Sequence, residues 1–215
     1  MEEPEIDRRM FVPDHYRAPD PRALVTHYPF AQLVSAAADG SPFATSVPIY
    51  FASDAPDEMT LVGHLARANP HASILAEGQQ VLVIFAGPHA YISRSWYVER
   101  PTVPTWDYLT AQVRGRLTPI DDDEEQLAIM QRTIAMSEGR NGSAWTMEHA
   151  PEGRVSFLLP MIRSFRIAIE RIDGVSKLNQ THPPGDRRRV VAALRARGSE
   201  GDFQIADFME QLDSA

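Results

Sequence analysis

The chain contains no cysteine among its 215 residues. It therefore forms no disulfide, and it has no thiolate for a zinc site, an iron–sulfur cluster or nucleophilic catalysis. Lysine is almost as scarce. The chain has 21 basic residues, and all of them except Lys177 are arginines. A single ammonium in an arginine-rich chain reflects either codon usage or a place where a planar guanidinium does not fit.

Long apolar runs and several catalytic motifs are missing as well. No apolar stretch reaches the roughly 18 residues that a membrane-spanning helix needs, and the start, Met1–Glu5, is acidic, unlike the basic start of a secretory signal. We therefore expect a cytoplasmic protein with no membrane segment. No Gly-x-Ser-x-Gly, Walker-type or Gly-x-Gly-x-x-Gly sequence occurs, so a serine hydrolase, a P-loop NTPase and a dinucleotide-binding Rossmann domain have no support.

The charge of the chain argues against direct binding to DNA. The net charge is −8, whereas affinity for DNA comes mainly from neutralising phosphates. Residues 186–197 and 202–212 are predicted as two helices joined by a glycine-containing turn, which is the outline of a DNA-reading pair. The second helix carries no basic residue, and DNA phosphates would repel it. We interpret the pair as a packing or interaction module. From Asp202 to the end of the chain, the acidic residues are Asp202, Asp207, Glu210 and Asp213.

Short β-strands dominate the middle of the chain. Asp39 and Gly40 form a hairpin signal, and Gly115 inside a long strand predicts a bulge or a close approach of another group. The apolar run 80–85 is typical of a strand buried on both faces. Too few helices interrupt the strands for a parallel sheet, so a mainly β barrel with peripheral helices (α+β) is favoured. The expected strands are 30–37, 42–51, 59–65, 80–85, 89–93, 105–120 and 164–172, and a turn is expected after the last of them, at Asp173 and Gly174.

We expect one domain over residues 1–215. Within it, residues 20–175 are predicted to form the barrel core with inserted helices, and 176–215 a C-terminal motif followed by the helical pair. Residues 1–19 are interpreted as an arm in which Met10–Val12 is a candidate edge strand. The sequence predicts a short helix from Pro21 to about His27, because Asp20 and Pro21 are favoured at a helix start.

A cation stands beside a predicted helix start. Asn69 is a good N-cap and Pro70 suits the first helical position, so a helix is expected from there to about Glu77, ending at Gly78. Arg67 lies just before it, where free N–H groups and the helix dipole favour an anion. The segment predicts a site of phosphate size. The alternative is an arginine that only pairs with a surface carboxylate.

Metal chemistry has little support in the sequence. Without cysteine the best candidate ligands are His64, His71 and His89, but their spacing matches no metal motif, and we expect no metal site. The acidic run Asp121–Glu125 opens a predicted helix. Carboxylates in a first turn complement the helix dipole, so we interpret this run as helix-start chemistry rather than as a metal site.

Several segments together resemble those of a known family. They are Met10–Pro13, His64–Pro70, Gly87–Ser93 with Ser95–Tyr97, Val103–Tyr108, and Lys177–Gln180. With these segments, nearly the whole chain resembles the PaiB-like proteins, FMN-binding negative transcriptional regulators with the flavin-reductase-like split barrel. The family usually reads Lys-Leu-Ser-Gln-Asn in the last segment, where this chain has Asn179 and Thr181.

The resemblance implies an FMN-binding split β-barrel that works as a homodimer, with the cofactor at the interface between subunits. Arg67 is then the natural partner of the phosphate. Tyr108 and Thr110 would come from the partner subunit, while Lys177 and Gln180 would contact the flavin ring or tie their own segment to the barrel. The implied cofactor-binding residues are Ser46, His64, Leu65, Ala66, Arg67, Asn69, Tyr108, Thr110, Lys177 and Gln180.

The resemblance implies a negative regulator of transcription, and the charge of the helical pair suggests that it acts indirectly. An FMN-dependent oxidoreductase acting on a small molecule and a heme-binding or heme-handling protein are the alternatives. No pair of acid and base residues stands out, so no catalytic residue is named, and FMN itself would carry any redox chemistry. The aromatic residues Trp96, Tyr97, Trp106 and Tyr108 are interpreted as part of a core or subunit interface, with a stacking platform for a planar ring as the alternative.

Overall fold

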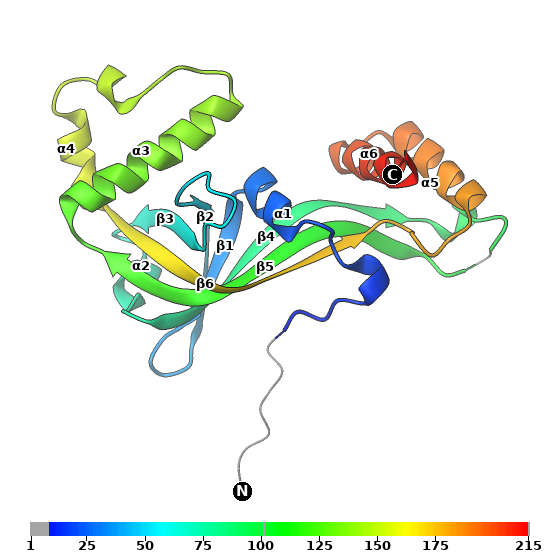
Figure 1. Cartoon of the computed structure of the whole chain (residues 1–215), viewed down its shortest axis with the longest axis horizontal. Helices are drawn as coiled ribbons and strands as arrows, with labels where there is room; N and C mark the ends of the chain where they lie inside the picture. The colour runs from blue at the N-terminus through cyan, green and yellow to red at the C-terminus, as the bar shows by residue number, and fades with distance from the viewer. Residues whose placement is uncertain (1–8, 101, 215) are drawn as a thin grey trace, which may run out of the picture. The chain divides into compact units, whose positions relative to one another are not determined.

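The structure is a computed structural model that describes residues 9–100 and 102–214 (Figure 1). Its strands form a closed barrel in the order β1-β2-β3-β6-β5-β4, and the pairs β1–β2, β1–β4, β2–β3 and β3–β6 are antiparallel. The predicted fold class, a mainly antiparallel barrel with peripheral helices, is confirmed. The strands are β1 (Phe30–Ala36), β2 (Pro42–Phe51), β3 (Thr60–Ala66), β4 (Gln79–Ile92), β5 (Thr105–Ile120) and β6 (Ile162–Lys177).

Helices connect and cover the strands. The α-helices are α1 (Pro21–His27), α2 (Pro70–Ile74), α3 (Asp123–Arg140), α4 (Arg154–Leu158), α5 (Pro184–Arg197) and α6 (Glu200–Ser214). Short 3₁₀ turns are η1 (Asp14–Tyr16), η2 (Arg94–Trp96), η3 (Met147–His149) and η4 (Leu159–Met161). None of the helices in the described ranges combines the length and apolar character needed to cross a membrane.

The chain divides into two compact units. The hairpin unit comprises residues 25–85 and 112–172, and the C-terminal unit comprises the described parts of 1–24, 86–111 and 173–215. Strands β4, β5 and β6 each contribute residues to both units. The expected partition into a barrel core over 20–175 and a C-terminal part over 176–215 stays a prediction.

The hairpin of β1 and β2 forms as local signals predict. Asp39 Oδ1 accepts a hydrogen bond from Ser41 N at 2.9 Å, and Gly40 has a φ of 85°, a conformation that favours glycine. The register places Ala36 opposite Pro42. In the hairpin unit, the core is built from alternate residues of several strands that are 0% exposed: Leu33, Ile49, Leu61, Val83, Val113, Leu117, Phe165 and Ile167.

Gly115 lies where two strands approach closely, as predicted. A Cβ atom at this position would lie 2.2 Å from the carbonyl oxygen of Ala168 in β6. Gly174 has a similar role, because a Cβ there would lie 2.7 Å from the Cβ of Pro21 in α1. The expected turn at Asp173 and Gly174 is therefore wrong. The glycine permits close packing while β6 continues to Lys177.

Three further expectations about elements are corrected. The strands expected at 80–85 and 89–93 are one strand, β4, in which alternate residues are buried, so the run 80–85 is not buried on both faces. The β1 ladder covers only Leu82–Ile84 of β4, so Pro88 interrupts no bond to β1. Helix α2 ends at Ile74 rather than near Glu77.

The N-terminal arm is partly described. Met10–Val12 does not form a strand; this segment leads into η1 instead. The first eight residues of the predicted arm lie outside the described residues.

Candidate functional site

A buried histidine fixes α2 to the hairpin of β1 and β2. His71 is 0% exposed, and its Nε2 and Nδ1 atoms lie 2.8 Å from Ser35 Oγ and 2.9 Å from Thr45 Oγ1. Asn69 caps the helix, as predicted: its Oδ1 accepts from His71 N at 2.9 Å, and its Nδ2 donates to Thr45 Oγ1 at 3.3 Å. Burial lowers the pKa of His71. Both ring nitrogens are used, so this histidine is a structural one.

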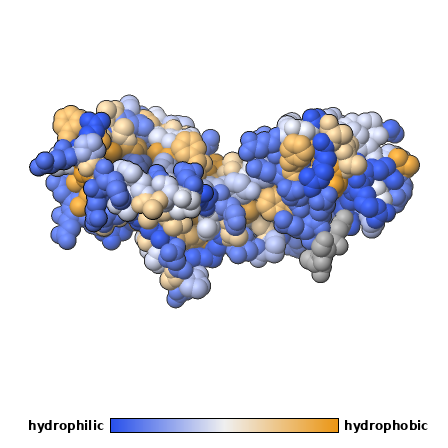
Figure 2. Space-filling model, turned by 90° about the horizontal axis from the view of Figure 1, so that it is seen from above, coloured by the Kyte–Doolittle hydropathy of each residue, from blue (hydrophilic) through white to orange (hydrophobic). Residues whose placement is uncertain are grey.

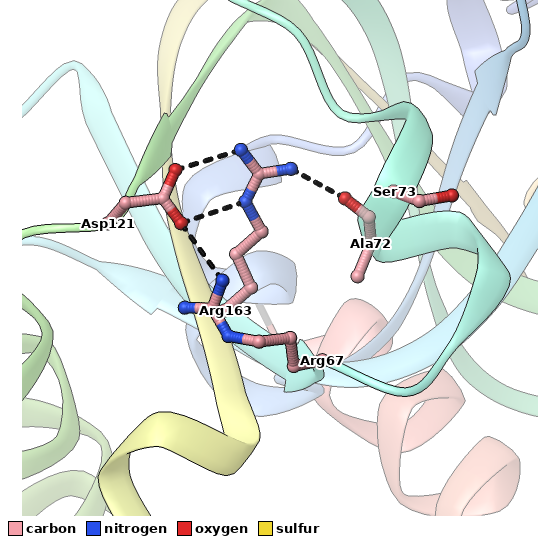
Figure 3. Close-up of a pocket in the computed structure, with 5 residues that line it drawn as sticks. All are labelled: Arg67, Ala72, Ser73, Asp121 and Arg163. Atoms are coloured by element: carbon pink, nitrogen blue, oxygen red, sulfur yellow. Dashed lines mark hydrogen bonds and ion pairs between the residues drawn. The ribbon is translucent and has the colours of Figure 1, made fainter.

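A cavity of about 440 Å³ opens beside α2. Arg67 follows the end of β3, Asp121 follows the end of β5, and Arg163 lies near the start of β6, opposite Leu65 of β3. The ends of three strands therefore bring the charged groups together. Figure 3 shows the two guanidiniums directed at one carboxylate. The lining residues are Arg67, Ala72, Ser73, Asp121 and Arg163.

Arg67 is held by the backbone and shares a carboxylate. Its Nε donates to the carbonyl oxygens of Pro160 and Ile162, each at 3.1 Å, and its Nη1 donates to Asp121 Oδ1 at 3.2 Å. Its backbone N–H donates to Met161 O at 2.8 Å. Nη2 makes no hydrogen bond within the part of the chain that the structure describes, and the side chain is 44% exposed. Arg67 thus pairs with a surface carboxylate and also faces a cavity.

Arg163 is a cavity residue that the sequence analysis missed. Its Nε and Nη2 donate to the two oxygens of Asp121 at 3.1 and 2.9 Å, and its Nη1 donates to Ala72 O at 2.6 Å. Arg163, and less strongly Arg67, hold the pKa of Asp121 below its ordinary value. Two guanidiniums thus face one ionised carboxylate, which leaves the cavity one positive charge in excess. Arg163 could have been predicted only from the register of β3 with β6, which a single sequence does not reveal.

The acidic run is helix-start chemistry from Asp122 onward, as interpreted, whereas Asp121 pairs with Arg67 and Arg163 instead. Asp122 caps α3 by accepting a hydrogen bond from Glu125 N at 2.9 Å. Glu125 itself pairs with Arg166. Among the described residues, no group of three or more metal-ligating side chains comes together.

The other predicted residues of the hairpin unit lie on different faces. Ser46 is exposed and adjacent to Thr45, so it points to the opposite face of β2 from the one that contacts His71. The side chain of Leu65 is buried in the core, so only its backbone is available to a ligand. Ala66 is exposed at the end of β3.

His64 lies on the side of β3 that α3 covers. It alternates with Val62, which packs against Ile129 of α3. The Nδ1 atom of His64 and the Oγ atom of Ser164, the residue opposite it in β6, are buried without a hydrogen-bond partner in the described ranges. Burial lowers the pKa of His64, so the ring is neutral at pH 7.

The remaining predicted residues belong to the C-terminal unit. Tyr108 and Thr110 are half-buried and share one face of β5. Lys177 Nζ donates to Thr105 Oγ1 and, at 2.8 Å, to Trp106 O. This contact ties the motif to β5, which is one of the two roles expected of it. Contact of Lys177 with a flavin ring stays a prediction.

Gln180 and Asn179 shape the turn after β6. Gln180 Oε1 accepts from Leu178 N at 2.7 Å, and its Nε2 donates to Ser176 O. Asn179 has a φ of 58°, in the left-handed region that asparagine tolerates better than most residues. These bonds occupy the side-chain amide of Gln180 within its own turn.

A second functional group that was not predicted from the sequence is a buried carboxyl. Asp107 of β5 is 0% exposed, and neither of its oxygens has a hydrogen-bond partner within the described part of the chain. Burial raises its pKa to about 7, although the charge of Lys177 opposes the shift. Tyr97 donates to Asn179 Oδ1 at 3.1 Å. Burial, with a smaller contribution from the charge of Asp107, raises the pKa of Tyr97 to about 12.

The four predicted interface aromatics have different environments. Tyr97 is buried and stacks on His182, with 4.5 Å between ring centroids. Trp106 is 53% exposed, and its ring lies 5.8 Å from that of His89 and 5.7 Å from that of Tyr91. Trp96 lies under the guanidinium of Arg197, and Tyr108 is half-buried. The exposed aromatic cluster thus consists of Tyr91 and Trp106, with His89 beside them.

Comparison with known proteins identifies the family. Residues 10–171 match the family model described as "Putative FMN-binding domain". The chain is 30% identical over 206 residues to the Protease synthase and sporulation protein PAI 2 of Bacillus subtilis (strain 168), covering 94% of this chain and 97% of that protein. The chain belongs to the PaiB-like family. The predicted family is confirmed, and the matched range of this PaiB-like chain includes all the residues that line the cavity.

Solved structures share the fold of this PaiB-like protein. The FAD and heme binding protein from Mycobacterium smegmatis matches with a TM-score of 0.54 at 16% identity, over 83% of this chain and 76% of that chain. The flavocytochrome Anf3 from Azotobacter vinelandii matches with a TM-score of 0.54 at 12% identity, over 78% of this chain and 71% of that chain. At these identities the likeness shows the split-barrel fold alone.

The Asp107 carboxyl predicts how stability depends on pH. Its folded-state pKa of about 7 lies above the ordinary value of 3.8, so the folded protein binds this proton more tightly than the unfolded chain does. The contribution of Asp107 to the free energy of unfolding is therefore highest below pH 4. It falls by roughly 2–4 kcal/mol as the pH rises to about 7. We expect Asp107→Asn to remove this decline.

Urea unfolding at several pH values between 4 and 8 measures this effect as the difference between the parent and Asp107→Asn at each pH. The exposed Asp14 of the same unit supplies a control variant, Asp14→Asn. A difference between the parent and Asp107→Asn that does not change with pH would show that the Asp107 carboxyl does not titrate in this range.

Proposed function

We propose that this chain binds FMN and that the cavity beside α2 receives the phosphate group of the cofactor. The supporting observation is the pair of guanidiniums of Arg67 and Arg163 with a net positive charge, in a family whose matching domain is named for FMN. Planar guanidiniums bind phosphate oxygens through charge-assisted hydrogen bonds. A volume of about 440 Å³ lies within the usual range for sites of small molecules.

The residues of the cavity fit a phosphate better than they fit a flavin ring. Arg67 offers an unused Nη2 group to an anion, whereas the Oγ of Ser73 already donates to Pro70 O at 2.7 Å. The ring and ribityl chain would extend along the backbone of His64, Leu65 and Ala66, as the family resemblance implies. When bound, the flavin supplies redox chemistry, while these residues bind and orient it.

An FMN-dependent oxidoreductase or a heme-handling protein remains the alternative function. The structurally similar Mycobacterium smegmatis protein is described as binding FAD and heme. The absorption spectrum of freshly purified protein distinguishes a flavin protein from a heme protein, because a bound flavin and a bound heme absorb at different wavelengths. A heme spectrum without flavin bands would contradict the proposed FMN function.

The first prediction for this function concerns Arg67. We expect Arg67→Ala to weaken FMN binding about ten- to a hundredfold, because a charge-assisted bond to phosphate contributes roughly 1.5–3 kcal/mol. Binding of riboflavin, which lacks the phosphate, should change little. Fluorescence-quench titration with both ligands measures the preference.

Arg132 provides a matched control for this experiment. It lies in the same unit and, like Arg67, bonds to a backbone carbonyl, Phe51 O at 3.2 Å, and to an aspartate, Asp54 at 2.7 Å. Arg132→Ala should leave the preference for FMN over riboflavin intact. If Arg67→Ala keeps the parent's preference as well, Arg67 does not bind the phosphate.

We further propose that the chain forms a homodimer through the aromatic cluster of the C-terminal unit. Figure 2 shows a mainly hydrophilic surface with separate hydrophobic groups. Trp106 and Val103 are 53% and 73% exposed on or just before β5. Exposed aromatic residues of this kind are typical of interface cores. The predicted contributions of Tyr108 and Thr110 to a neighbour's cofactor depend on this dimer.

Sedimentation velocity at micromolar concentration tests the dimer. We expect the parent to sediment as a dimer and Trp106→Glu to dissociate, because a charge would replace apolar contact at the interface. Trp145 of the hairpin unit is 41% exposed and supplies the control Trp145→Glu, which should remain dimeric. A parent that sediments as a monomer would rule out the shared site.

We propose that the protein is cytoplasmic and that it regulates transcription indirectly, without binding DNA itself. The basic residues of α5 are largely occupied by neighbouring acids. Arg195 bonds to Asp207 at 2.6 Å and Glu210 at 2.7 Å, and Arg197 pairs with Asp202 of α6. Guanidiniums used in this way are not free to bind DNA phosphates.

We therefore expect no sequence-specific DNA affinity. Fluorescence anisotropy with sheared genomic DNA of the host, at physiological salt and with or without FMN, should give dissociation constants above about 1 µM, in the range of nonspecific binding. Saturable nanomolar binding that survives competitor DNA would contradict indirect regulation. Such binding only in the presence of FMN would indicate a repressor controlled by its cofactor.

A further inference from the structure

The carboxylate of Asp121 occupies the position at which a bound phosphate would meet both arginines. It accepts three hydrogen bonds, from Arg67 Nη1 at 3.2 Å and from Arg163 Nε and Nη2 at 3.1 and 2.9 Å. Three donors that converge on one group match the three terminal oxygens of a phosphate monoester. Figure 3 shows the Asp121 carboxylate on one side of the cluster, with interactions to both guanidiniums.

Both guanidiniums have backbone partners in addition to Asp121. Arg163 Nη1 is bound to Ala72 O at 2.6 Å, and Arg67 Nε is bound to Pro160 O and Ile162 O, each at 3.1 Å. These acceptors are backbone carbonyls at the C-terminal end of α2 and at the junction of η4 and β6. We therefore expect the donors to stay directed into the cavity when the charge of Asp121 is removed.

Exchange between Asp121 and a ligand needs no unfolding. The side chains of Asp121 and Arg67 are 54% and 44% exposed, so water and small anions reach the ion pair directly. Exposed ion pairs contribute little to stability, typically below about 1 kcal/mol. Arg163, with 18% of its side chain exposed, is the fixed member of the cluster.

We propose that Asp121 competes with the phosphate of the ligand for Arg67 and Arg163. Its carboxylate holds the two arginines until the more highly charged phosphate replaces it. The proposal rests on the proposed FMN site. A carboxylate ligand has the same charge and the same acceptor oxygens as the Asp121 side chain, so it has no advantage over Asp121 in binding these arginines. A phosphate dianion carries more charge and more acceptors, so the cavity selects phosphate monoesters over carboxylates.

Asp121 stays ionised while this competition takes place. The two arginines hold its pKa below the ordinary value of an aspartate, so mild acid does not remove the competitor. A phosphate monoester, by contrast, loses its second charge below a pH of about 6. The selectivity for phosphate should therefore weaken on the acid side of neutrality.

The variant Asp121→Asn tests the proposal, because it removes the charge and keeps the size of the side chain. We expect FMN to bind about tenfold more tightly than to the parent, a change of about 1.4 kcal/mol, with riboflavin affinity unchanged. Asp54 is also paired with an arginine, Arg132, but lies outside the cavity. The control Asp54→Asn should leave both affinities as in the parent.

The outcomes separate this proposal from the proposed function. If the parent prefers FMN over riboflavin but Asp121→Asn binds FMN equally well or less well, Asp121 positions the arginines and does not compete, while the FMN site stands. If the parent shows no preference for FMN, the FMN site fails.

Inorganic phosphate then tests the competitor without the flavin. We expect millimolar phosphate to raise the thermal unfolding midpoint of Asp121→Asn more than that of the parent, with sodium acetate at equal ionic strength as the reference. Equal shifts in the two proteins would overturn the proposal. The unfolding midpoints without added anion show that each variant is folded before its affinity is compared.

Discussion

The ion cluster of Arg67, Asp121 and Arg163 is the interaction on which this part of the molecule depends. It joins the end of β3, the end of β5, the start of β6 and the last turn of α2 through a single carboxylate and four backbone carbonyls. The backbone N–H of Arg67 continues the contact with the segment before β6. The residue after Asp121 then caps α3. The contacts between these strands and the proposed phosphate site therefore use the same charged groups.

Two aspartates of the same barrel show how strongly position decides chemistry. Asp121 receives three hydrogen bonds from arginines, which favour its charged form. Asp107 is enclosed by the C-terminal unit, has no hydrogen bond to the described residues, and favours its neutral form up to a pH of about 7. Lys177 lies close enough to oppose that shift, yet its ammonium is bound to Thr105 and to the backbone of Trp106.

Local signals in the sequence predicted much of the fold. The bounds of β5, the hairpin at Asp39 and Gly40, the cap at Asn69 and the close approach at Gly115 were all readable, because each depends on neighbouring residues or on the absence of one side chain. The turn expected at Gly174 was wrong because the same residue type also permits close packing against α1. A sequence alone does not distinguish these two uses of glycine.

The partners of the cavity depended on contacts between distant parts of the chain. Arg67 was readable beside its helix start, whereas Arg163 and Asp121 meet it only through the register of β3 with β6 and the length of β5. Thr45 was missed in the same way, since its neighbour Ser46 carries the same functional group but points to the other face of β2.

The bonds between the two arginines and backbone carbonyls have an entropic consequence. A long arginine side chain normally loses about 2 kcal/mol of rotamer freedom when a ligand fixes it. In this cavity Arg163 and Arg67 are already ordered by carbonyl oxygens before any anion arrives. That ordering belongs to the free energy of folding rather than to binding, so the anion affinity that we propose for the cavity depends mainly on charge and desolvation.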